Sequence, residues 1–419
     1  MTELLGGEQL GNLALITMGQ SPAPGSCDDI DHGMPFLQGC AEFGNQHPES
    51  KSFCHAPLKV AKASSTLISV RAPVGTTNRA DRDYCIGRGL AAILARGVTE
   101  NNDFLQYAVE QNVGFLHRHS QGSTFLAISS RDLHQMKVPH PQRVVQDKIA
   151  DILLTIDGAI HHTDVLIEKH KQIKTGLMHD LFTRGLDSSG KLRPLQAEAP
   201  ELYYSTPKGQ IPLEWCCSLL DEVAHRGSGH TPSKSFPEYW NGGIKWISLA
   251  DCSALDRVYI SDTENHISGL GVQNSSAVIH PPGIVVLSRD AGVGKSAITT
   301  DNMAVSQHFM CWQPGPRLNT HYLYYWLQYR KRDFENIATG STIPTIGLRF
   351  FKKYKICVPK SIVEQRKIGL GLLNVDLYLF SLEKHLAKLR RIRSGLMNDL
   401  LNGYVSVRVG NSQDEIVDV

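Results

Sequence analysis

Two stretches in opposite halves of the chain decide the fold: VQDKIADILLTIDGAI, which begins at Val145, and EQRKIGLGLLNVDLYL, which begins at Glu364. They align without a gap, and Gln146 falls on Gln365, an offset of 219 residues in a chain of 419. An internal repeat has to be recognised before local structure is assigned, because it determines the architecture. A period of half the chain is too long for a solenoid unit of about 20 to 50 residues, so it indicates a duplicated domain plus helix.

The same offset continues on both sides of these stretches. Downstream, KTGLMHDLF (174–182) aligns with RSGLMNDLL (393–401), and upstream SVRAPVG (69–75) aligns with SRDAGVG (288–294). The repeat therefore includes a segment well before each stretch. At roughly 100 to 200 residues per domain, the length predicts two to four domains, and the offset indicates that each half contributes one of them.

Each repeated stretch belongs to a long predicted helix, at residues 143–185 and 361–404. Apolar residues recur there at alternating steps of four and three, the 3.5-residue period of coiled-coil packing. At 1.5 Å per residue, a helix of about 40 residues is about 60 Å long and could hold two domains far apart. We expect the helices to pair with each other, although packing of each on its own domain, or dimerisation of two chains, also fits the pattern. The expected seam positions include Ile149, Ile156, Leu177, Ile368, Val375, Leu382, Leu389 and Leu396.

The remaining segments have a different texture. They are rich in Gly, Pro and short apolar runs such as STLISV (65–70) and GIVVLS (283–288), which indicates mixed domains with a strong β component. The predicted fold class is α+β, with two mixed α/β domains, two long antiparallel coiled-coil helices that separate them, and a pseudo-twofold internal duplication. The predicted segments are a first domain at 1–142, a helix at 143–185, a linker at 186–210, a second domain at 211–360, a helix at 361–404 and a tail at 405–419.

Composition places few limits on function. Lys and Arg total 43 against 41 Asp and Glu, so the net charge of +2 does not by itself identify a nucleic-acid-binding protein. A hydrophobic content of 41% is ordinary for a chain that buries real cores. Nine Cys without a CxxC pair favour reduced thiols over a disulfide framework or a zinc site. The start of the chain lacks a signal-peptide pattern and no run approaches ~18 apolar residues, so we expect a soluble, cytoplasmic protein.

No motif for catalysis or for cofactor binding is complete. DAGVGKS (290–296) resembles a phosphate-binding loop, but that motif requires Gly at the position of Arg289, so a tight turn is the better interpretation. Cys54-His55 and His161-His162 lack a second pair at zinc-finger spacing, so no metal site is predicted. No G-x-S-x-G elbow supports a nucleophile. We therefore predict no catalytic residue and no cofactor bound by this chain.

The order of its motifs and their twofold repetition resemble the specificity subunit of type I restriction-modification systems along nearly the whole chain. The motifs are the paired helix ends quoted above together with GQSPAPG (19–25), ISVRAPVG (68–75), CIGRGLAAI (85–93), IPLEW (211–215), HTPSK (230–234), IKWISLAD (244–251) and HPPGIVVLSRDAGVGKSAI (280–298). The resemblance implies a non-catalytic subunit that binds double-stranded DNA. Each target-recognition domain would read one half of a bipartite, asymmetric sequence, and the helices would set the spacing between the halves.

The resemblance also implies protein partners. Two modification subunits would methylate adenine with S-adenosylmethionine, and two restriction subunits would use ATP and Mg to translocate and cleave DNA. The helices and adjoining regions would dock the modification subunits. A runner-up function is an adaptor that binds proteins through two modules on a coiled coil. Salt separates these functions, because DNA binding weakens steeply as salt rises.

The side chains expected to contact DNA lie in loops, several of them near glycine-rich turns. Arg reads guanine and Asn or Gln reads adenine in direct base recognition, while Lys and Arg bind phosphates. For any single residue, a solvated surface charge is an equally good interpretation. The candidates are Gln20, Arg71, Arg79, Arg82 and Arg88 in the first domain and Arg226, Lys234, Arg289 and Lys295 in the second, with Gln38, Asn78, Asn241 and Gln273 as further candidates.

Two cations interrupt the apolar seams at equivalent positions, Lys174 and Arg393. A cation at a seam position either faces a phosphate or a partner, or extends its charged end to solvent. The sequence leaves these interpretations open.

Overall fold

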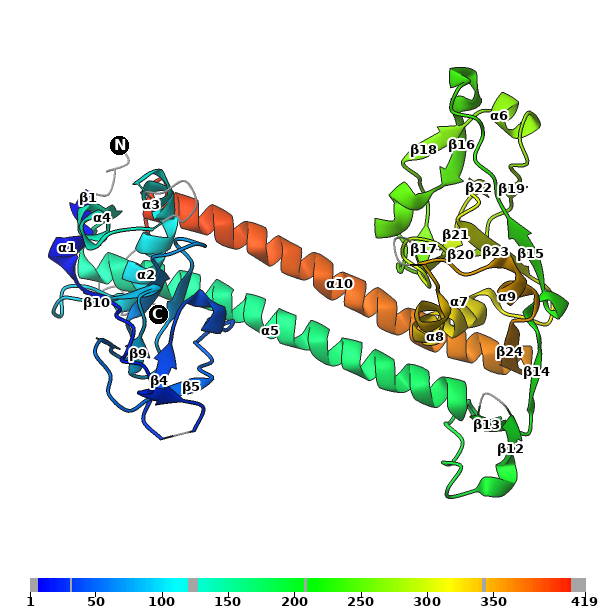
Figure 1. Ribbon diagram of the computed structural model, residues 1–419, viewed down its shortest axis with the longest axis horizontal. Coiled ribbons are helices and arrows are strands. Elements are labelled where there is room, and N and C mark those ends of the chain that lie inside the picture. Colours follow the sequence, from blue (N-terminus) through cyan, green and yellow to red (C-terminus); the bar gives the residue numbers. More distant parts are fainter. Residues whose placement is uncertain (1–6, 31, 120–126, 207–208, 341–343, 408–419) are drawn as a thin grey trace, which may run out of the picture. The chain divides into compact units, whose positions relative to one another are not determined.

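The structure is a computed structural model that describes residues 7–30, 32–119, 127–206, 209–340 and 344–407. The chain forms two compact units (Figure 1). Unit 1 consists of Met1–Val165 with Lys384–Val419, and unit 2 consists of Leu166–Glu383. Each long helix contributes one half to each unit. Residues 408–419 of the predicted tail lie outside the described residues.

In unit 1, the chain before the long helix folds into two sheets, a short ladder and small helices. The strands are β1 Gly7–Gln9, β2 Ala14–Met18, β3 Cys27–Asp28, β4 Met34–Leu37, β5 Ser52–Cys54, β6 Val60–Ala61, β7 Thr66–Ser69, β8 Thr77–Arg79, β9 Tyr84–Ile86, β10 Leu90–Ala95 and β11 Lys137–Pro139. The helices are α1 Leu10–Leu13, α2 Asn102–Gln111, α3 Val113–His119 and α4 Ser130–Gln135. One sheet has the order β2-β10-β7-β8 and the other β3-β5-β4-β9-β6, while β1 pairs with β11. The predicted strand STLISV contains β7, which is buried along its whole length.

Unit 2 repeats this plan. Its strands are β12 Tyr203–Thr206, β13 Gly209–Pro212, β14 Trp215–Leu219, β15 Ala224–Ser228, β16 Trp240–Ile247, β17 Tyr259–Ile260, β18 Asn265–Ile267, β19 Ile279–His280, β20 Val285–Ser288, β21 Ser296–Thr299, β22 Met303–Val305, β23 Phe309–Pro314 and β24 Lys355–Pro359. The helices are α6 Gly269–Gln273, α7 Thr320–Tyr329, α8 Lys331–Ile337 and α9 Leu348–Lys352. The larger sheets have the orders β15-β23-β20-β21-β17 and β18-β16-β22-β19, and β14 pairs with β24. The predicted strand GIVVLS contains β20.

The duplication extends to individual hydrogen bonds. The backbone N–H of Ser69 donates to the carbonyl of Thr76 at 2.8 Å, and that of Ser288 donates to Lys295 at 2.8 Å. Both turns use a glycine with positive φ, Gly75 at 89° and Gly294 at 85°, a conformation that glycine adopts without steric cost. DAGVGKS therefore forms the predicted tight turn, and the ammonium of Lys295 donates to the carbonyl of Cys252 at 3.0 Å.

The repeated glutamines hold a helix cap in each unit. Asn101 caps α2 and Asn319 caps α7, each accepting backbone N–H donors from the first turn, as a capping side chain should. The backbone N–H of Asn101 donates to Gln146 Oε1 at 2.9 Å, and that of Asn319 donates to Gln365 Oε1 at 2.9 Å. Gln146 thus connects the short helix α2 to the first long helix, and Gln365 connects the equivalent short helix α7 to the second long helix.

The long helices are α5, Arg143–Thr183, and α10, Ile362–Leu401. In unit 1 the first half of α5 lies antiparallel to the last half of α10, as the contacts Asp157–Arg393 (2.5 Å) and Asp164–Arg390 (3.1 Å) show (Figure 1). In unit 2 the other halves pair in the same sense, with Lys174 bonded to Asp376 at 2.5 Å.

The seam residues lie where the 3.5-residue period predicts. None of the eight expected positions is exposed, whereas Leu166, Ile173 and Leu377, which lie off the seams, are. The buried seam residues are Ile149, Ile368 and Leu389, and the partly buried ones are Ile156, Leu177, Val375, Leu382 and Leu396. Ile149 and Leu396 contribute to the core of unit 1, and Leu177 and Ile368 contribute to that of unit 2.

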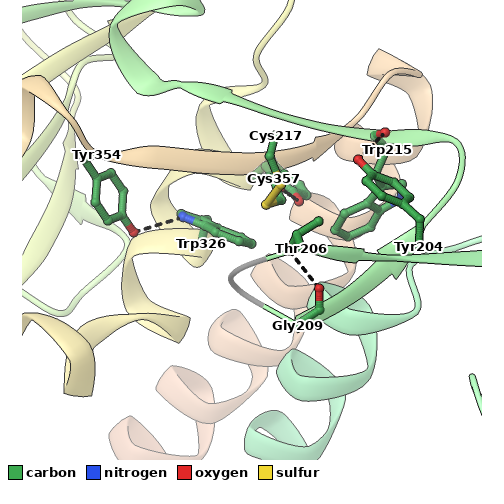
Figure 2. Close-up of a disulfide and its surroundings, with 9 residues drawn as sticks. Tyr204, Thr206, Gly209, Trp215, Cys217, Trp326, Tyr354 and Cys357 are labelled. Carbon is green, nitrogen blue, oxygen red and sulfur yellow. Dashed lines mark hydrogen bonds between the residues drawn. A yellow bond between two sulfur atoms is a disulfide. The ribbon is translucent and has the colours of Figure 1, made fainter.

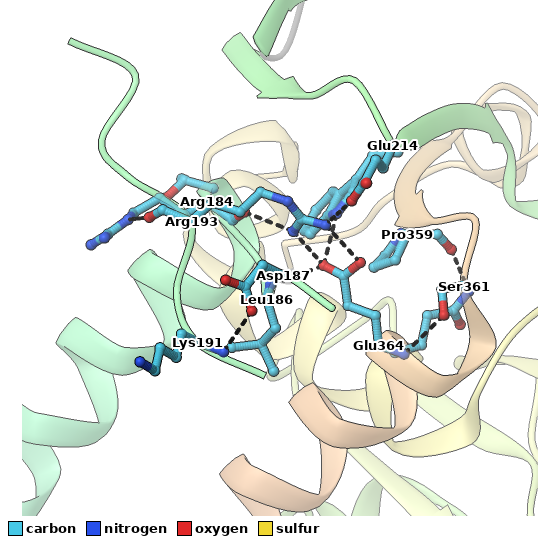
Figure 3. Close-up of polar contacts among 12 residues, drawn as sticks. Arg184, Leu186, Asp187, Lys191, Arg193, Glu214, Pro359, Ser361 and Glu364 are labelled. Atoms are coloured by element: carbon cyan, nitrogen blue, oxygen red, sulfur yellow. Dashed lines mark hydrogen bonds and ion pairs between the residues drawn. The ribbon is translucent and has the colours of Figure 1, made fainter. Parts of the chain in front are cut away.

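The predicted linker folds back onto the start of α10 in unit 2. Arg193 is buried, and its guanidinium donates to both carboxylate oxygens of Glu364, at 2.7 and 3.1 Å (Figure 3). The indole N–H of Trp215 donates to the same carboxylate at 3.1 Å. Val145 occupies the position equivalent to Glu364 in the first half, so this ion pair belongs to unit 2 alone.

The expectation that every cysteine is a free thiol is wrong for two of the nine. Cys217 on β14 and Cys357 on β24 form a disulfide (Figure 2). They are directly opposite each other in the antiparallel pair and 140 residues apart in sequence. Spacing along the chain could not reveal this pair, because it depends on which strands become neighbours. Within the described residues, no helix is long and apolar enough to span a bilayer.

Candidate nucleic-acid interface

Three segments of the first domain meet at the Gly87–Gly89 turn between β9 and β10. The backbone N–H of Gln20 donates to the carbonyl of Ile86 at 2.9 Å, and that of Val70 donates to Gly89 at 2.9 Å. Gly87 itself donates to Leu37 at 2.8 Å. The turn therefore brings the ends of β2, β4 and β7 to one place.

Two glycines make this close approach possible. A Cβ on Gly19 would lie 2.1 Å from the carbonyl oxygen of Gly87, and a Cβ on Gly89 would lie 2.5 Å from that of Gln38. Either contact would displace a backbone segment. The side chains presented around the turn are exposed and define the first edge: Gln20, Gln38, Arg71 and Arg88.

Unit 2 contains the same backbone frame, in which the ends of strands are hydrogen-bonded to one turn. Here the turn is residues 306–308, between β22 and β23. The backbone N–H of Ser306 donates to Ile247 at 2.8 Å, and that of Arg289 donates to His308 at 3.0 Å, which are the equivalents of two bonds in unit 1. Gly229 approaches this frame as Gly19 does in unit 1, since an added Cβ would lie 1.5 Å from the carbonyl oxygen of Val305. The second edge consists of the residues at the same places in this frame: His230 follows Gly229, Ser248 follows Ile247, Asp290 follows Arg289, and Gln307 lies between Ser306 and His308.

The two edges differ in chemistry. The first edge carries two exposed guanidinium groups and two exposed amides. At the second edge Asp290 is buried and accepts from His308 Nδ1 at 2.8 Å, while His230 and Gln307 are exposed. Arg and Gln match guanine and adenine edges, and His and Gln offer a different set of donors and acceptors. The two units therefore share the backbone frame, but they present different side chains on it.

Four of the nine candidate residues are exposed with no side-chain partner recorded among the described residues: Gln20, Arg71, Arg88 and Lys234. Arg82 is also exposed, but its guanidinium binds one carboxylate oxygen of Asp81 at 2.9 and 3.0 Å. Of the further candidates, Gln38, Asn241 and Gln273 are exposed, whereas Asn78 is buried and donates to the carbonyl of Gly44 at 2.7 Å.

The other four candidates make ion pairs or hydrogen bonds within the protein. Arg79 pairs with Asp103 of α2, and burial lowers the pKa of Arg79. Arg226 pairs with Asp221 at 2.9 Å. Arg289 donates to the carbonyls of Gln307 and Ile346, both at 3.0 Å, and Lys295 donates to Cys252. Each of the four side chains makes at least one contact within the protein, which leaves less of each group for a phosphate.

Sequence reasoning missed most of the second edge. His230 lay inside the quoted motif HTPSK but was not chosen, and Gln307 and Asp290 were not considered. A signal was present, because GQSP (19–22) and GHTP (229–232) share the pattern G-x-[ST]-P, and Gln307 aligns with Arg88 at the offset of 219. Within the described residues, no three His, Cys, Asp or Glu side chains lie together as metal ligands. Lys174 and Arg393 are in ion pairs with Asp376 and Asp157.

A comparison with known families gives one match in each half of the chain. The family model described as the type I restriction modification DNA specificity domain matches residues 39–169 and 212–390, one match in each half. The MjaIX specificity subunit of a type I restriction enzyme from Methanocaldococcus jannaschii is 31% identical over 169 residues, which cover 40% of this chain and 39% of that protein. The EcoR124I/EcoR124II specificity subunit of Escherichia coli is 29% identical over 163 residues, 37% of this chain and 39% of that protein.

These alignments span about two fifths of the length of each curated relative. Among solved structures, the S subunit of a type I restriction-modification system from M. genitalium has the same fold, with a TM-score of 0.64 and 16% identity over 96% of this chain and 97% of that one. Similarity at that level of identity shows the fold alone, whereas the family model matches a segment in each half of the chain.

Proposed function

The chain belongs to the family of the type I restriction modification DNA specificity domain. We propose that it is the subunit that determines which DNA sequence such a complex recognises. One observation carries this proposal. The duplicated domains present exposed polar side chains on the same backbone frame, with Arg71 and Arg88 at the first edge and His230 and Gln307 at the second. Equal frames with different side chains suit a reader of two different half-sites.

In this proposal, α5 and α10 set the distance between the half-sites. Half-sites one DNA turn apart are separated by roughly 34–36 Å, and helices of 41 and 40 residues are each about 60 Å long. Two copies of one modification subunit would bind the duplicated chain, and two restriction subunits would join them. S-adenosylmethionine, ATP and Mg would be bound by those partners, and the complex would act on DNA in the cytoplasm.

The small net charge is compatible with this function. Phosphate binding depends on the local density of Lys and Arg, because each neutralised phosphate releases condensed counterions. The backbone bond from Val70 to Gly89 places Arg71 and Arg88 next to the same turn, whereas many other cations of the chain are in internal ion pairs. The charge of +2 is thus an average over surfaces with different roles.

The deciding experiment is to express the chain with its modification subunit and to sequence the methylated DNA. We expect N6-methyladenine in one bipartite, asymmetric sequence with a fixed number of base pairs between its halves. Binding of the purified complex to that duplex should weaken steeply as salt rises. Absence of methylation at any sequence, or binding insensitive to salt, would contradict the proposal and favour the protein-binding adaptor.

A further inference from the structure

Each unit contains a cation, an aspartate and a tyrosine that join three helices. The cation and the aspartate come from the two long helices, and the tyrosine comes from the short helix that packs the recognition domain against them. The first lock is Arg393 of α10, Asp157 of α5, and Tyr107 and Glu110 of α2. The second lock is Lys174 of α5, Asp376 of α10 and Tyr325 of α7.

In the first lock, the guanidinium of Arg393 binds two carboxylates. It lies 2.5 Å from Asp157 Oδ1 and donates to the two oxygens of Glu110 at 2.9 and 3.0 Å. The hydroxyl of Tyr107 donates to Asp157 Oδ2 at 2.8 Å, and the guanidinium lies 5.9 Å from the tyrosine ring centroid. The fork of an arginine suits such bidentate binding, so α2 is attached to both long helices.

The second lock repeats this arrangement with the two long helices exchanged. Lys174 lies 2.5 Å from Asp376 Oδ1, and the hydroxyl of Tyr325 donates to Asp376 Oδ2 at 2.8 Å. The ammonium of Lys174 lies 5.7 Å from the ring centroid of Tyr325. Burial raises the pKa of both Tyr107 and Tyr325, so each hydroxyl remains a donor at neutral pH.

The locks differ in one carboxylate. Gln328 of α7 stands at the position of Glu110, and it donates instead to Asp256 and to Ser296, both at 2.8 Å. The only cation–carboxylate pair recorded for Lys174 in the described residues is with Asp376. The first lock therefore has a direct ion pair between domain and helix that the second lacks.

We infer that Arg393 and Lys174 are positioning residues, each of which fixes one recognition domain on the long helices of its own unit and thereby the register in which that half-site is read. The effect on register rests on the function proposed above, whereas the attachment of each domain follows from the contacts alone.

Attachment is measured by amide hydrogen exchange in the full chain. Arg393→Met should speed exchange in α2 by about tenfold or more, because the partly buried carboxylates of Glu110 and Asp157 lose their counter-charge, and should leave α7 unchanged. Lys174→Met should do the converse, so each variant is the control for the other. The double variant Arg393→Lys/Glu110→Gln gives the first lock the composition of the second and should change exchange in α2 by less than about threefold. Unchanged exchange in α2 of Arg393→Met would overturn the inference.

Register is measured by sequencing DNA methylated by each variant with its modification subunit. Arg393→Met should methylate sites whose spacer differs from the wild-type length by about one base pair, since a loosened domain can bind at neighbouring positions, while both half-site sequences stay the same. Faster exchange with an unaltered spacer would overturn the positioning role and leave only a structural one. If the wild-type chain methylates nothing, the proposed function fails, and the exchange measurement still decides whether the locks hold the domains.

A variant that does not fold would obscure these results, so a milder pair is included. Tyr107→Phe and Tyr325→Phe each remove one hydroxyl and keep the ring in place. Each should speed exchange only in its own short helix. Equal effects of either change on both α2 and α7 would show that the locks are not independent.

Discussion

At the scale of single residues, the buried pair Arg193–Glu364 should contribute more to stability than any exposed ion pair. The two side chains are 7% and 8% exposed, and breaking a buried pair on one side costs about 3–5 kcal/mol because a charge remains without its partner. Because Arg193 still pairs with the exposed carboxylate of Glu214, we expect Glu364→Gln to lower the free energy of unfolding by about 3 kcal/mol, the lower end of that range, in urea titrations.

Two further variants sharpen this measurement. Arg193→Met/Glu364→Val copies the Val145 of the first half and should recover part of the loss, because it removes both charges together. Recovery stays incomplete because the indole N–H of Trp215 and the backbone N–H of Leu186 lose their acceptor. Glu168→Gln breaks the exposed pair with Lys171 (2.8 Å) and should cost only about 0.5 kcal/mol or less. An equal cost for Glu364→Gln and Glu168→Gln would show that burial does not strengthen the pair.

Arg88 at the first edge is exposed and should contact a DNA phosphate. Arg88→Ala should weaken binding to the methylated target duplex and reduce the slope of log affinity against log salt by about one, the loss of one phosphate contact. Arg82→Ala is the matched control, since it removes the same charge from a nearby loop where Asp81 already binds the guanidinium. If both variants show the same loss of affinity and the same reduction in salt slope, the positive charge contributes to DNA binding regardless of its position at the first edge.

At the scale of elements, the length of the long helices should set the half-site spacing. Inserting seven residues after 165 in α5 and after 383 in α10 preserves the seams of both helices and lengthens each by about 10.5 Å. We expect the spacer in the methylated sequence to grow by about three base pairs at ~3.4 Å each. Inserting four residues into α5 alone shifts its seam against α10 and should alter or abolish recognition. An unchanged spacer in the seven-residue variant would show that the length of the long helices does not set the half-site spacing.

The long helices and the division into two units could be predicted from the sequence, whereas the strand order and the disulfide could not. The long helices were predictable because their period is local and repeats over many turns, and the two units were predictable from the alignment of Gln146 with Gln365. The order β3-β5-β4-β9-β6 and the Cys217–Cys357 bond were not, since both depend on strands that meet from distant parts of the chain. Arg79 and Arg88 looked equivalent as charges near glycines, and only the fold places Asp103 beside Arg79 and not beside Arg88.

At the scale of the whole molecule, the duplication predicts two independent readers. Replacing residues 1–142 by the same segment of a family member should change one half-site in the methylated sequence, and leave the other half and the spacer as they are. The donor has to supply a tyrosine and a carboxylate at the positions of Tyr107 and Glu110, because these side chains must meet Asp157 and Arg393 of the recipient. The control is the reciprocal exchange of residues 211–360, which should change only the other half. A change in both halves from either exchange would mean that the two domains do not read DNA independently, and a change in the spacer from a donor that preserves the first lock would mean that the lock does not set the register.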